Sequence, residues 1–341
     1  MDRIYNRNKC ISLEIKYNYN SNGMGYVIMK KYKKVIVLGA GFSKSLCSSM
    51  PLIKDLLENI EENSLLKSFV SGAKDKLYDY FDVENCVSYI LSRKIFFNDK
   101  EDIKFYTLRK EMLKHIYNEM KDCEPDEDKI EIMGKFLYYC DKENILLVTF
   151  NYDLFIEKIC KKLCEKEKFI VKYGIKLNQD PYQESERVDG LNLNEKNIEL
   201  LKLHGSFNWF SMSKSDNADI DDVILLEQND INEIFIEDVP FFVPMSNTKH
   251  KYFAGDFYKL LWKKMKYYID NAEELDFIGY GFPKTDFDNL MLFSFYKEKV
   301  KNIVISKTTE DKETKRRLEK IFSSARVHTD GAIKYIDKIT K

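Results

Sequence analysis

The sequence has few of the residues that punctuate or cross-link a chain: 13 glycines, 6 prolines and 4 histidines among 341 residues. Its 7 cysteines are scattered and include no Cys-x-x-Cys pair, which argues against a zinc module and favours a reduced compartment. Cys160 and Cys164 share one helical face, and helix packing explains them more simply than a metal site does. We therefore predict no bound metal.

Long apolar runs and an excess of charge are also missing. No stretch of 18 apolar residues exists, and the N-terminus lacks the apolar region of a secretory signal. We expect no membrane-spanning helix and a cytoplasmic location. With 55 basic against 56 acidic residues, the formal charge of -1 argues against direct binding of nucleic acid through its phosphates.

Short, nearly continuous apolar runs bounded by turn residues recur along the chain. They lie at 34–41, 145–153, 199–206, 275–282, 302–306 and 325–329. Such runs are typical of strands buried on both faces of a parallel sheet. Segments with helical periodicity alternate with them, at 51–63, 153–167, 254–272 and 312–325. The alternation predicts an α/β fold built on a doubly wound, Rossmann-like parallel sheet.

One long segment, residues 61–140, interrupts this alternation with amphipathic helical patterns, and we interpret it as a helical insertion. Residues 34–60 and 141–341 then form the Rossmann-like domain. Residues 1–33 are an extension rich in Asn, Tyr and Lys, with Met29 as an alternative start. Residues 170–198 and 211–240 are rich in Asn, Asp and Ser, which predicts loops with short strands.

The first predicted strand ends in the turn Gly39-Ala40-Gly41, followed by Phe42 and Ser43. Glycine lets backbone N–H groups approach a ligand closely, and a helix N-terminus beyond the turn suits the phosphates of a dinucleotide. The third glycine of the usual dinucleotide motif is absent, and Ser43 stands near its place. A purely structural turn is the alternative.

Polar residues close the next two strands at the edge where open parallel sheets bind ligands. Thr149, Asn151 and Asp153 end one strand, and helix capping is the alternative role for Asn151 and Asp153. His204, just before Gly205, ends the other. Its imidazole is a natural general base near neutral pH, although a lone histidine is more often structural.

A second glycine turn, Gly279-Tyr280-Gly281, follows a later strand, with Asp286 and Asp288 near the start of the next helix. Such a carboxylate could accept hydrogen bonds from ribose hydroxyls, as an acidic residue does in dinucleotide-binding folds. Capping the helix is an equally good use of either aspartate.

Taken in order, these segments resemble the SIR2-like family, in particular bacterial sirtuin-related NAD-hydrolase domains of antiphage defence systems. The resemblance spans about residues 34–306 and rests on GAGFSKSLCSSMPLIKDLL, TFNYD, KLHGS, PFFVPMSNTKHKYFAGDFYKLLW and FIGYGFPKTDFD. It implies that Asn151 and His204 are the catalytic pair around the nicotinamide ribose. It also implies that the first glycine turn holds the NAD phosphates and that the second lies near the adenosine.

The departures from deacylase sirtuins narrow the implied activity. Those enzymes carry a four-cysteine zinc module after the His-Gly segment, whereas this chain has no cysteine beyond Cys164. The arginine of the deacylase loop is also missing, where PLIKDLL stands instead. The resemblance therefore implies hydrolysis of NAD+ to nicotinamide and ADP-ribose, with NAD as substrate. Asp153 would orient the site, Phe42 would cover the nicotinamide, and Ser43 and Thr149 would help to bind the dinucleotide.

The resemblance further implies an abortive-infection effector that depletes cellular NAD. A homo-oligomer is expected, with a separately encoded ATPase or sensor protein as a further partner. Two alternatives stay open: a non-catalytic module that senses NAD or ADP-ribose, and an NAD-dependent protein deacylase.

Overall fold

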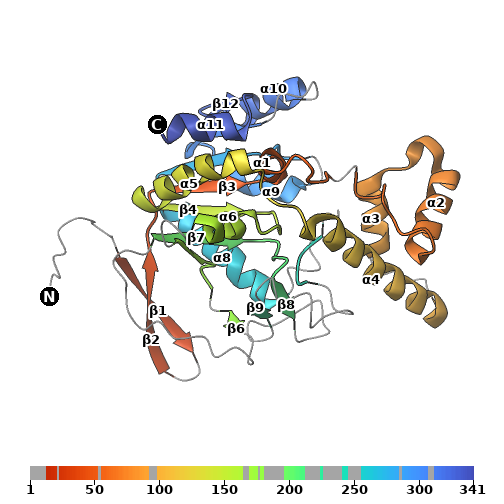
Figure 1. The fold of residues 1–341 in the computed structure, drawn as a ribbon. Helices are drawn as coiled ribbons and strands as arrows, with labels where there is room; N and C mark the ends of the chain where they lie inside the picture. The colour runs from red at the N-terminus through yellow and green to blue at the C-terminus, as the bar shows by residue number, and fades with distance from the viewer. Residues whose placement is uncertain are drawn as a thin grey trace.

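The computed structural model describes residues 13–20, 23–52, 55–91, 98–163, 169–175, 177–179, 196–211, 223–225, 240–244, 255–283, 286–305 and 311–341. A parallel sheet of seven strands lies at its centre (Figure 1). In spatial order the strands are β12 (Arg326–His328), β11 (Val300–Val304), β10 (Glu274–Ile278), β3 (Lys34–Leu38), β4 (Ile145–Thr149), β7 (Lys196–Lys202) and β5 (Phe169–Lys172). The predicted doubly wound α/β fold is confirmed.

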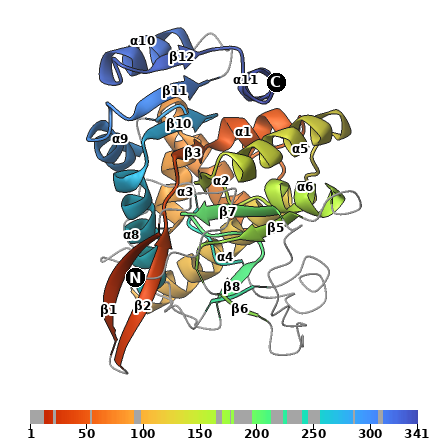
Figure 2. The same cartoon turned by 90° about the vertical axis from the view of Figure 1, so that its left-hand side faces the viewer.

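Helices cover both faces of this sheet. In Figure 2, one layer stands to the right of the strands and another to the left. The right-hand layer contains α1 (Ala40–Leu46), α5 (Glu127–Lys142), α6 (Phe155–Leu163) and α11 (Ala332–Ile339). The left-hand layer contains α8 (Asp256–Asn271), α9 (Phe287–Ser294) and, above them, α10 (Asp311–Ile321). This two-sided cover explains why all five residues of β4 are buried and why the strand is apolar up to Thr149 at its end.

The strand order places the change of winding direction at β3. The chain runs from β3 to β4 on one side and later returns to β10 on the other, so β3 lies between them. In open α/β sheets a ligand crevice forms at such a switch point, beyond the carboxyl ends of the strands. Both glycine turns and the Asn151 segment follow these three strands directly.

The helical insertion projects from one end of the molecule (Figure 1). It contains α2 (Leu65–Leu77), a short 3₁₀ turn (Tyr78–Tyr80), α3 (Val83–Leu91) and α4 (Asp99–Lys121). A capping box begins α4, since the Asn98 side chain accepts from the amides of Lys100 and Glu101 while the Glu101 carboxylate accepts from the Asn98 amide. The predicted boundary at 140 stays a prediction; α5 (Glu127–Lys142) runs across it and packs against β4 and β7.

The smaller elements lie outside the main sheet. Within the predicted extension, β1 (Leu13–Asn20) and β2 (Gly23–Lys30) pair as an antiparallel hairpin. A second sheet joins β6 (Asn178–Gln179), β9 (Val223–Leu225) and β8 (Trp209–Ser211). The short strands expected within 170–198 and 211–240 are thus present in the described parts of those segments.

The helix predicted over 51–63 is wrong for the residues described there, which form successive turns. The Asp55 carboxylate accepts a hydrogen bond from the Leu52 amide at 2.9 Å, and the Asp55 amide donates to the Leu52 carbonyl oxygen at 2.9 Å. A short polar side chain that binds nearby backbone competes with helix formation. The helix that follows the first glycine turn is instead α1, which begins at Ala40.

Candidate functional site

The two glycine turns pack directly against each other at the carboxyl ends of β3 and β10. The Gly39 amide donates to the Ile278 carbonyl oxygen at 3.0 Å, and the Gly41 amide donates to that of Gly279 at 2.9 Å. Gly279 has a φ of 70°, and a Cβ there would lie 2.0 Å from the Phe42 nitrogen. Only glycine fits this contact. The turns therefore hold each other, and the binding of phosphate by the first turn stays a prediction.

The Asn151 side chain has a fixed orientation beneath the first turn. Its Nδ2 donates to the Gly39 carbonyl oxygen at 2.9 Å and to Ser43 Oγ at 2.7 Å, which uses both amide hydrogens. Thr149 supports the same segment, because its hydroxyl donates to the Leu38 carbonyl oxygen and accepts from the Asn151 amide. Within the described residues, Asn151 Oδ1 has no partner. Asn151 can therefore act toward a ligand only as a hydrogen-bond acceptor.

Ser43 links Asn151 to Asp153. Its hydroxyl donates to Asp153 Oδ2 at 2.6 Å while accepting from Asn151, so its single proton is directed into the protein. The other carboxylate oxygen of Asp153 accepts from the Phe155 amide at 3.1 Å and caps α6. Asp153 thus performs the capping role and also orients Ser43, whereas Asn151 does not cap. Ser43 positions Asn151, and a contact from Ser43 to phosphate stays a prediction.

Burial raises the pKa of Asp153 above its ordinary value, while the Lys202 charge and the Ser43 hydrogen bond oppose this shift. A raised pKa in the folded state means that folding favours the protonated carboxyl. The contribution of protonated Asp153 to the free energy of unfolding is fully present below the ordinary pKa of an aspartate. It is lost as the pH rises through the pKa of Asp153 in the folded protein.

We therefore expect Asp153→Asn to gain stability relative to the wild type as the pH rises from about 4 to 8. Thermal unfolding of both proteins across this range measures the difference. A deficit of constant size at every pH would mean that the hydrogen bonds of the carboxylate matter more than the cost of burying its charge. In the same samples, nicotinamide release by the variant should fall, because the acceptor that orients Ser43 is changed.

A buried lysine, Lys202, extends the network and was missed by the sequence analysis. Its Nζ lies 2.5 Å from the Asp153 carbonyl oxygen and 2.9 Å from Glu157 Oε1, and its side chain is 1% exposed. Glu157 also accepts from the Tyr173 hydroxyl, which in turn accepts from the Asn208 side chain. The sequence feature that could have identified Lys202 is its place inside the apolar run ELLKLHGS. A charged side chain in a strand that helices cover on both faces requires a buried counter-ion.

His204 follows β7 at the same edge of the sheet. Thr149 pairs with Lys202 in the ladder between β4 and β7, so Asn151 and His204 stand at equivalent positions, each two residues further on. The His204 side chain is 95% buried and its ring centroid lies 5.0 Å from that of Phe150, the neighbour of Asn151. Gly205, with a φ of 80°, turns the chain directly afterwards. The catalytic assignment of this pair stays a prediction, supported by their common edge.

The second glycine turn is held by contacts of Tyr280 and of the Gly281 carbonyl oxygen. Tyr280 packs against Phe150, at 4.9 Å between ring centroids, and its hydroxyl donates to Asp286 at 2.9 Å. Asp286 makes no side-chain cap to α9. The carbonyl oxygen of Gly281 accepts from Arg317 on α10. Ala40 is exposed and Phe42 is buried in the core. A contact from Phe42 to the nicotinamide stays a prediction.

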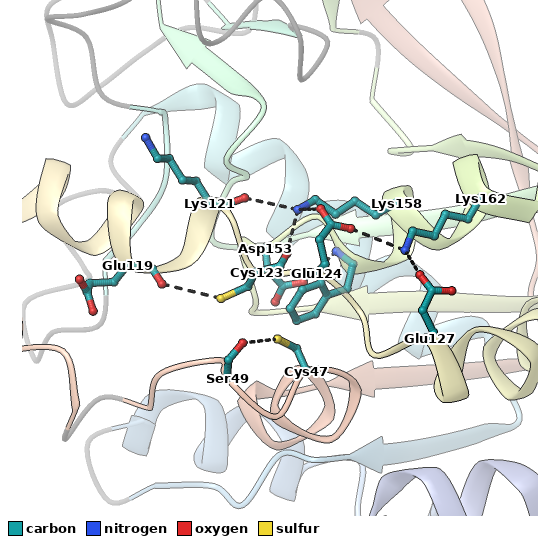
Figure 3. A network of polar contacts seen from close by, with 11 residues as sticks. Cys47, Ser49, Glu119, Lys121, Cys123, Glu124, Glu127, Asp153, Lys158 and Lys162 are labelled. Carbon is teal, nitrogen blue, oxygen red and sulfur yellow. Dashed lines mark hydrogen bonds and ion pairs between the residues drawn. The ribbon is translucent and has the colours of Figure 1, made fainter.

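The base of the insertion is fixed to the helices that follow the site (Figure 3). Lys158 on α6, only 7% exposed, donates to the Cys123 carbonyl oxygen at 2.8 Å and pairs with Glu124 at 2.7 Å. The Asp126 amide donates to the Leu46 carbonyl oxygen at the end of α1. The loop between α4 and α5 is therefore tied to both α1 and α6.

Two further findings concern metals and membranes. In the described ranges, no group of three or more His, Cys, Asp or Glu side chains is arranged to hold a metal ion. Of the helices in the described part of the chain, none is both long and apolar enough to cross a membrane. Cys164 and residues 245–254, which the sequence analysis singled out, lie outside the described residues.

Comparison with known proteins gives a family and several solved structures. A family model described as a SIR2-like domain matches residues 145–326. A crystal structure of a Sir2 homologue–NAD complex is 11% identical, with 90% of this chain and 88% of that chain covered and a TM-score of 0.43. A structure titled for the mechanism and regulation of Sir2 enzymes is also 11% identical, with 91% of each chain covered and a TM-score of 0.41. No curated protein matches the chain.

Proposed function

The chain belongs to the SIR2-like domain family, which implies an NAD-dependent enzyme, and from this premise we propose that it hydrolyses NAD+. The reaction cleaves the N-glycosidic bond between nicotinamide and ribose, and water supplies the hydroxyl of the ADP-ribose product. The observation that carries the proposal is the orientation of Asn151. Both hydrogens of its amide are used, so among the described residues its side chain has only the acceptor Oδ1 left, at the switch point of the sheet.

Cleavage of this bond passes through a ribose that carries positive charge. The site must hold the sugar in place and admit one water molecule. Asn151 Oδ1 accepts a hydrogen bond from that water or from a ribose hydroxyl. His204, one strand away, accepts the proton that the nucleophile loses. Ser43 and Asp153 hold Asn151 in the required orientation, and the second glycine turn and Asp286 stand on the adenosine side.

The resemblance to defence-associated relatives supports a cellular role for this activity. Hydrolysis of NAD without control would kill the host, so the enzyme would act as an antiphage effector that depletes NAD once infection is sensed. A separately encoded ATPase or sensor protein would supply that control.

Incubation of the purified full chain with NAD+, with the products separated by chromatography, tests the proposal. We expect nicotinamide and ADP-ribose to appear in equal amounts without any added peptide. Nicotinamide release that requires an acetyl-lysine peptide would identify a deacylase instead. Calorimetric binding of NAD+ or ADP-ribose without nicotinamide release would identify a sensing module.

A further inference from the structure

Arg317 on α10 binds the backbone of the second glycine turn. Its Nη2, which carries two hydrogens, donates to the Gly281 carbonyl oxygen at 3.1 Å and to the Phe282 carbonyl oxygen at 2.8 Å. Within the described part of the chain, Arg317 makes no ion pair with a carboxylate, and its Nε is buried without a hydrogen-bond partner. In that part of the chain, the hydrogen bonds of this cation therefore all go to the turn.

The backbone that Arg317 binds has an unusual conformation. Phe282 lies in the left-handed region, with a φ of 51°, which costs free energy in a residue with a Cβ. Neighbouring residues of an extended chain alternate in direction, so two successive carbonyl groups meet one nitrogen where the chain turns between them. Phe282 makes that turn, and its buried ring lies 4.7 Å from that of Phe277, between centroids. Such strain persists only where surrounding contacts impose it, and Arg317 supplies two of them.

The packing of the turn does not account for the glycine at position 281. Among the described residues, no atom lies within 4 Å of a Cβ built on Gly281, and its φ is outside the left-handed region. Gly279 differs in both respects, as its contact with Phe42 shows. A glycine with open space beside its Cα is typical of a place where a ligand approaches the backbone closely. The open side of Gly281 is therefore the part of the turn that is available to a ligand.

We propose that Arg317 is a positioning residue, which holds the backbone of Gly281 and Phe282 in the conformation that binds the adenosine half of NAD+. This inference rests on the proposed function, which supplies the ligand of the turn. Asn151 and His204 follow β4 and β7, whereas Arg317 acts on the turn that follows β10. Loss of Arg317 should therefore weaken binding and leave the chemical step unchanged. If the binding conformation falls to about a tenth of the molecules, the apparent Kd rises about tenfold.

Calorimetry with ADP-ribose and steady-state kinetics with NAD+, both on the full chain, test this role. We expect Arg317→Met to raise the Kd for ADP-ribose and the KM for NAD+ about tenfold, with kcat within about twofold of the wild type. Arg317→Lys should recover most of the affinity, because an ammonium group can also donate to both carbonyl oxygens. Arg316→Met makes the same replacement at the exposed neighbouring residue and should bind ADP-ribose like the wild type.

Leu318→Ala separates positioning from stability. Leu318 is buried on the same helix, so its truncation should lower the thermal unfolding midpoint at least as much as Arg317→Met does and leave the Kd unchanged. An unchanged Kd in folded Arg317→Met, an equal rise in Leu318→Ala, or a loss confined to kcat would overturn the proposal. If Arg317→Met does not fold, Arg317→Gln is measured instead, because its side chain is too short to reach both carbonyl oxygens. Wild-type affinity in that variant would have the same meaning.

The two measurements keep the role of Arg317 separate from the proposed hydrolysis. A wild type that binds ADP-ribose without releasing nicotinamide would contradict hydrolysis, and the Kd of Arg317→Met would still decide the role of Arg317. Nicotinamide release by the wild type, together with wild-type Kd and KM in Arg317→Met, would contradict the role of Arg317 alone. A wild type that binds neither ADP-ribose nor NAD+ would contradict both.

Discussion

Replacement of His204 by alanine is expected to reduce the rate of nicotinamide release by about 10²- to 10⁴-fold, the usual contribution of a general base. The ordinary pKa of an imidazole, near 6.5, suits proton transfer at neutral pH. The only other polar side chain assigned to the reacting sugar is Asn151, whose available atom accepts a hydrogen bond but takes no proton. Within the proposed site, the proton of the nucleophile therefore has one destination. Chromatographic measurement of nicotinamide with time, at saturating NAD+, gives the comparison.

Two controls separate this chemistry from a packing defect. Because the His204 ring is buried against Phe150, alanine leaves a small void, so unfolding should be compared by thermal melts. His204→Gln keeps more of the volume and should be as inactive as the alanine variant. His328→Ala makes the same replacement on β12, at the opposite side of the sheet, and should keep the wild-type rate. Full activity in folded His204→Ala would remove His204 from the mechanism.

The strands were the most predictable part of the fold. Six of the seven strands of the main sheet correspond to apolar runs, because a strand covered on both faces has to be apolar at nearly every position. The edge strand β5 is short, and its burial falls from Phe169 to Lys172, so it carries little pattern. Helix prediction failed at 51–63, where side-chain bonds to local backbone outweighed the apolar periodicity.

The site was predictable in its parts but not in its connections. The residue types at the strand ends indicated which side chains share an edge of the sheet. Their roles depend on partners far away in the sequence: Asn151 is oriented by Gly39 and Ser43, each more than 100 residues away. Lys202 and Glu157 are 45 residues apart, and although Lys202 begins the KLHGS segment, nothing in that segment indicates its partner. Contacts of this kind follow from the strand order, which periodicity alone does not determine.

Replacement of Lys202 by methionine is expected to destabilise the fold by about 3 kcal/mol, the lower end of the range for breaking a buried ion pair. Methionine fills much of the space but leaves the Glu157 carboxylate without its cation and the Asp153 carbonyl oxygen without its donor. The lower end applies because the Glu157 side chain keeps 16% exposure. Urea unfolding of the full chain measures the loss. Lys162→Met, at an exposed pair with Glu127, is the matched control and should cost no more than about 1 kcal/mol.

The double variant Lys202→Met with Glu157→Gln distinguishes an uncompensated charge from lost packing. Glutamine removes the lone carboxylate and still offers an oxygen to the Tyr173 hydroxyl, so most of the stability should return. Activity should not return with it, because the Asp153 carbonyl oxygen still lacks its donor. The segment from Asn151 to Asp153 is then no longer fixed by the hydrogen bond from Lys202. Stability and activity that recover together would show that Lys202 serves the fold alone. Recovery of stability without activity would place Lys202 among the residues that position Asn151.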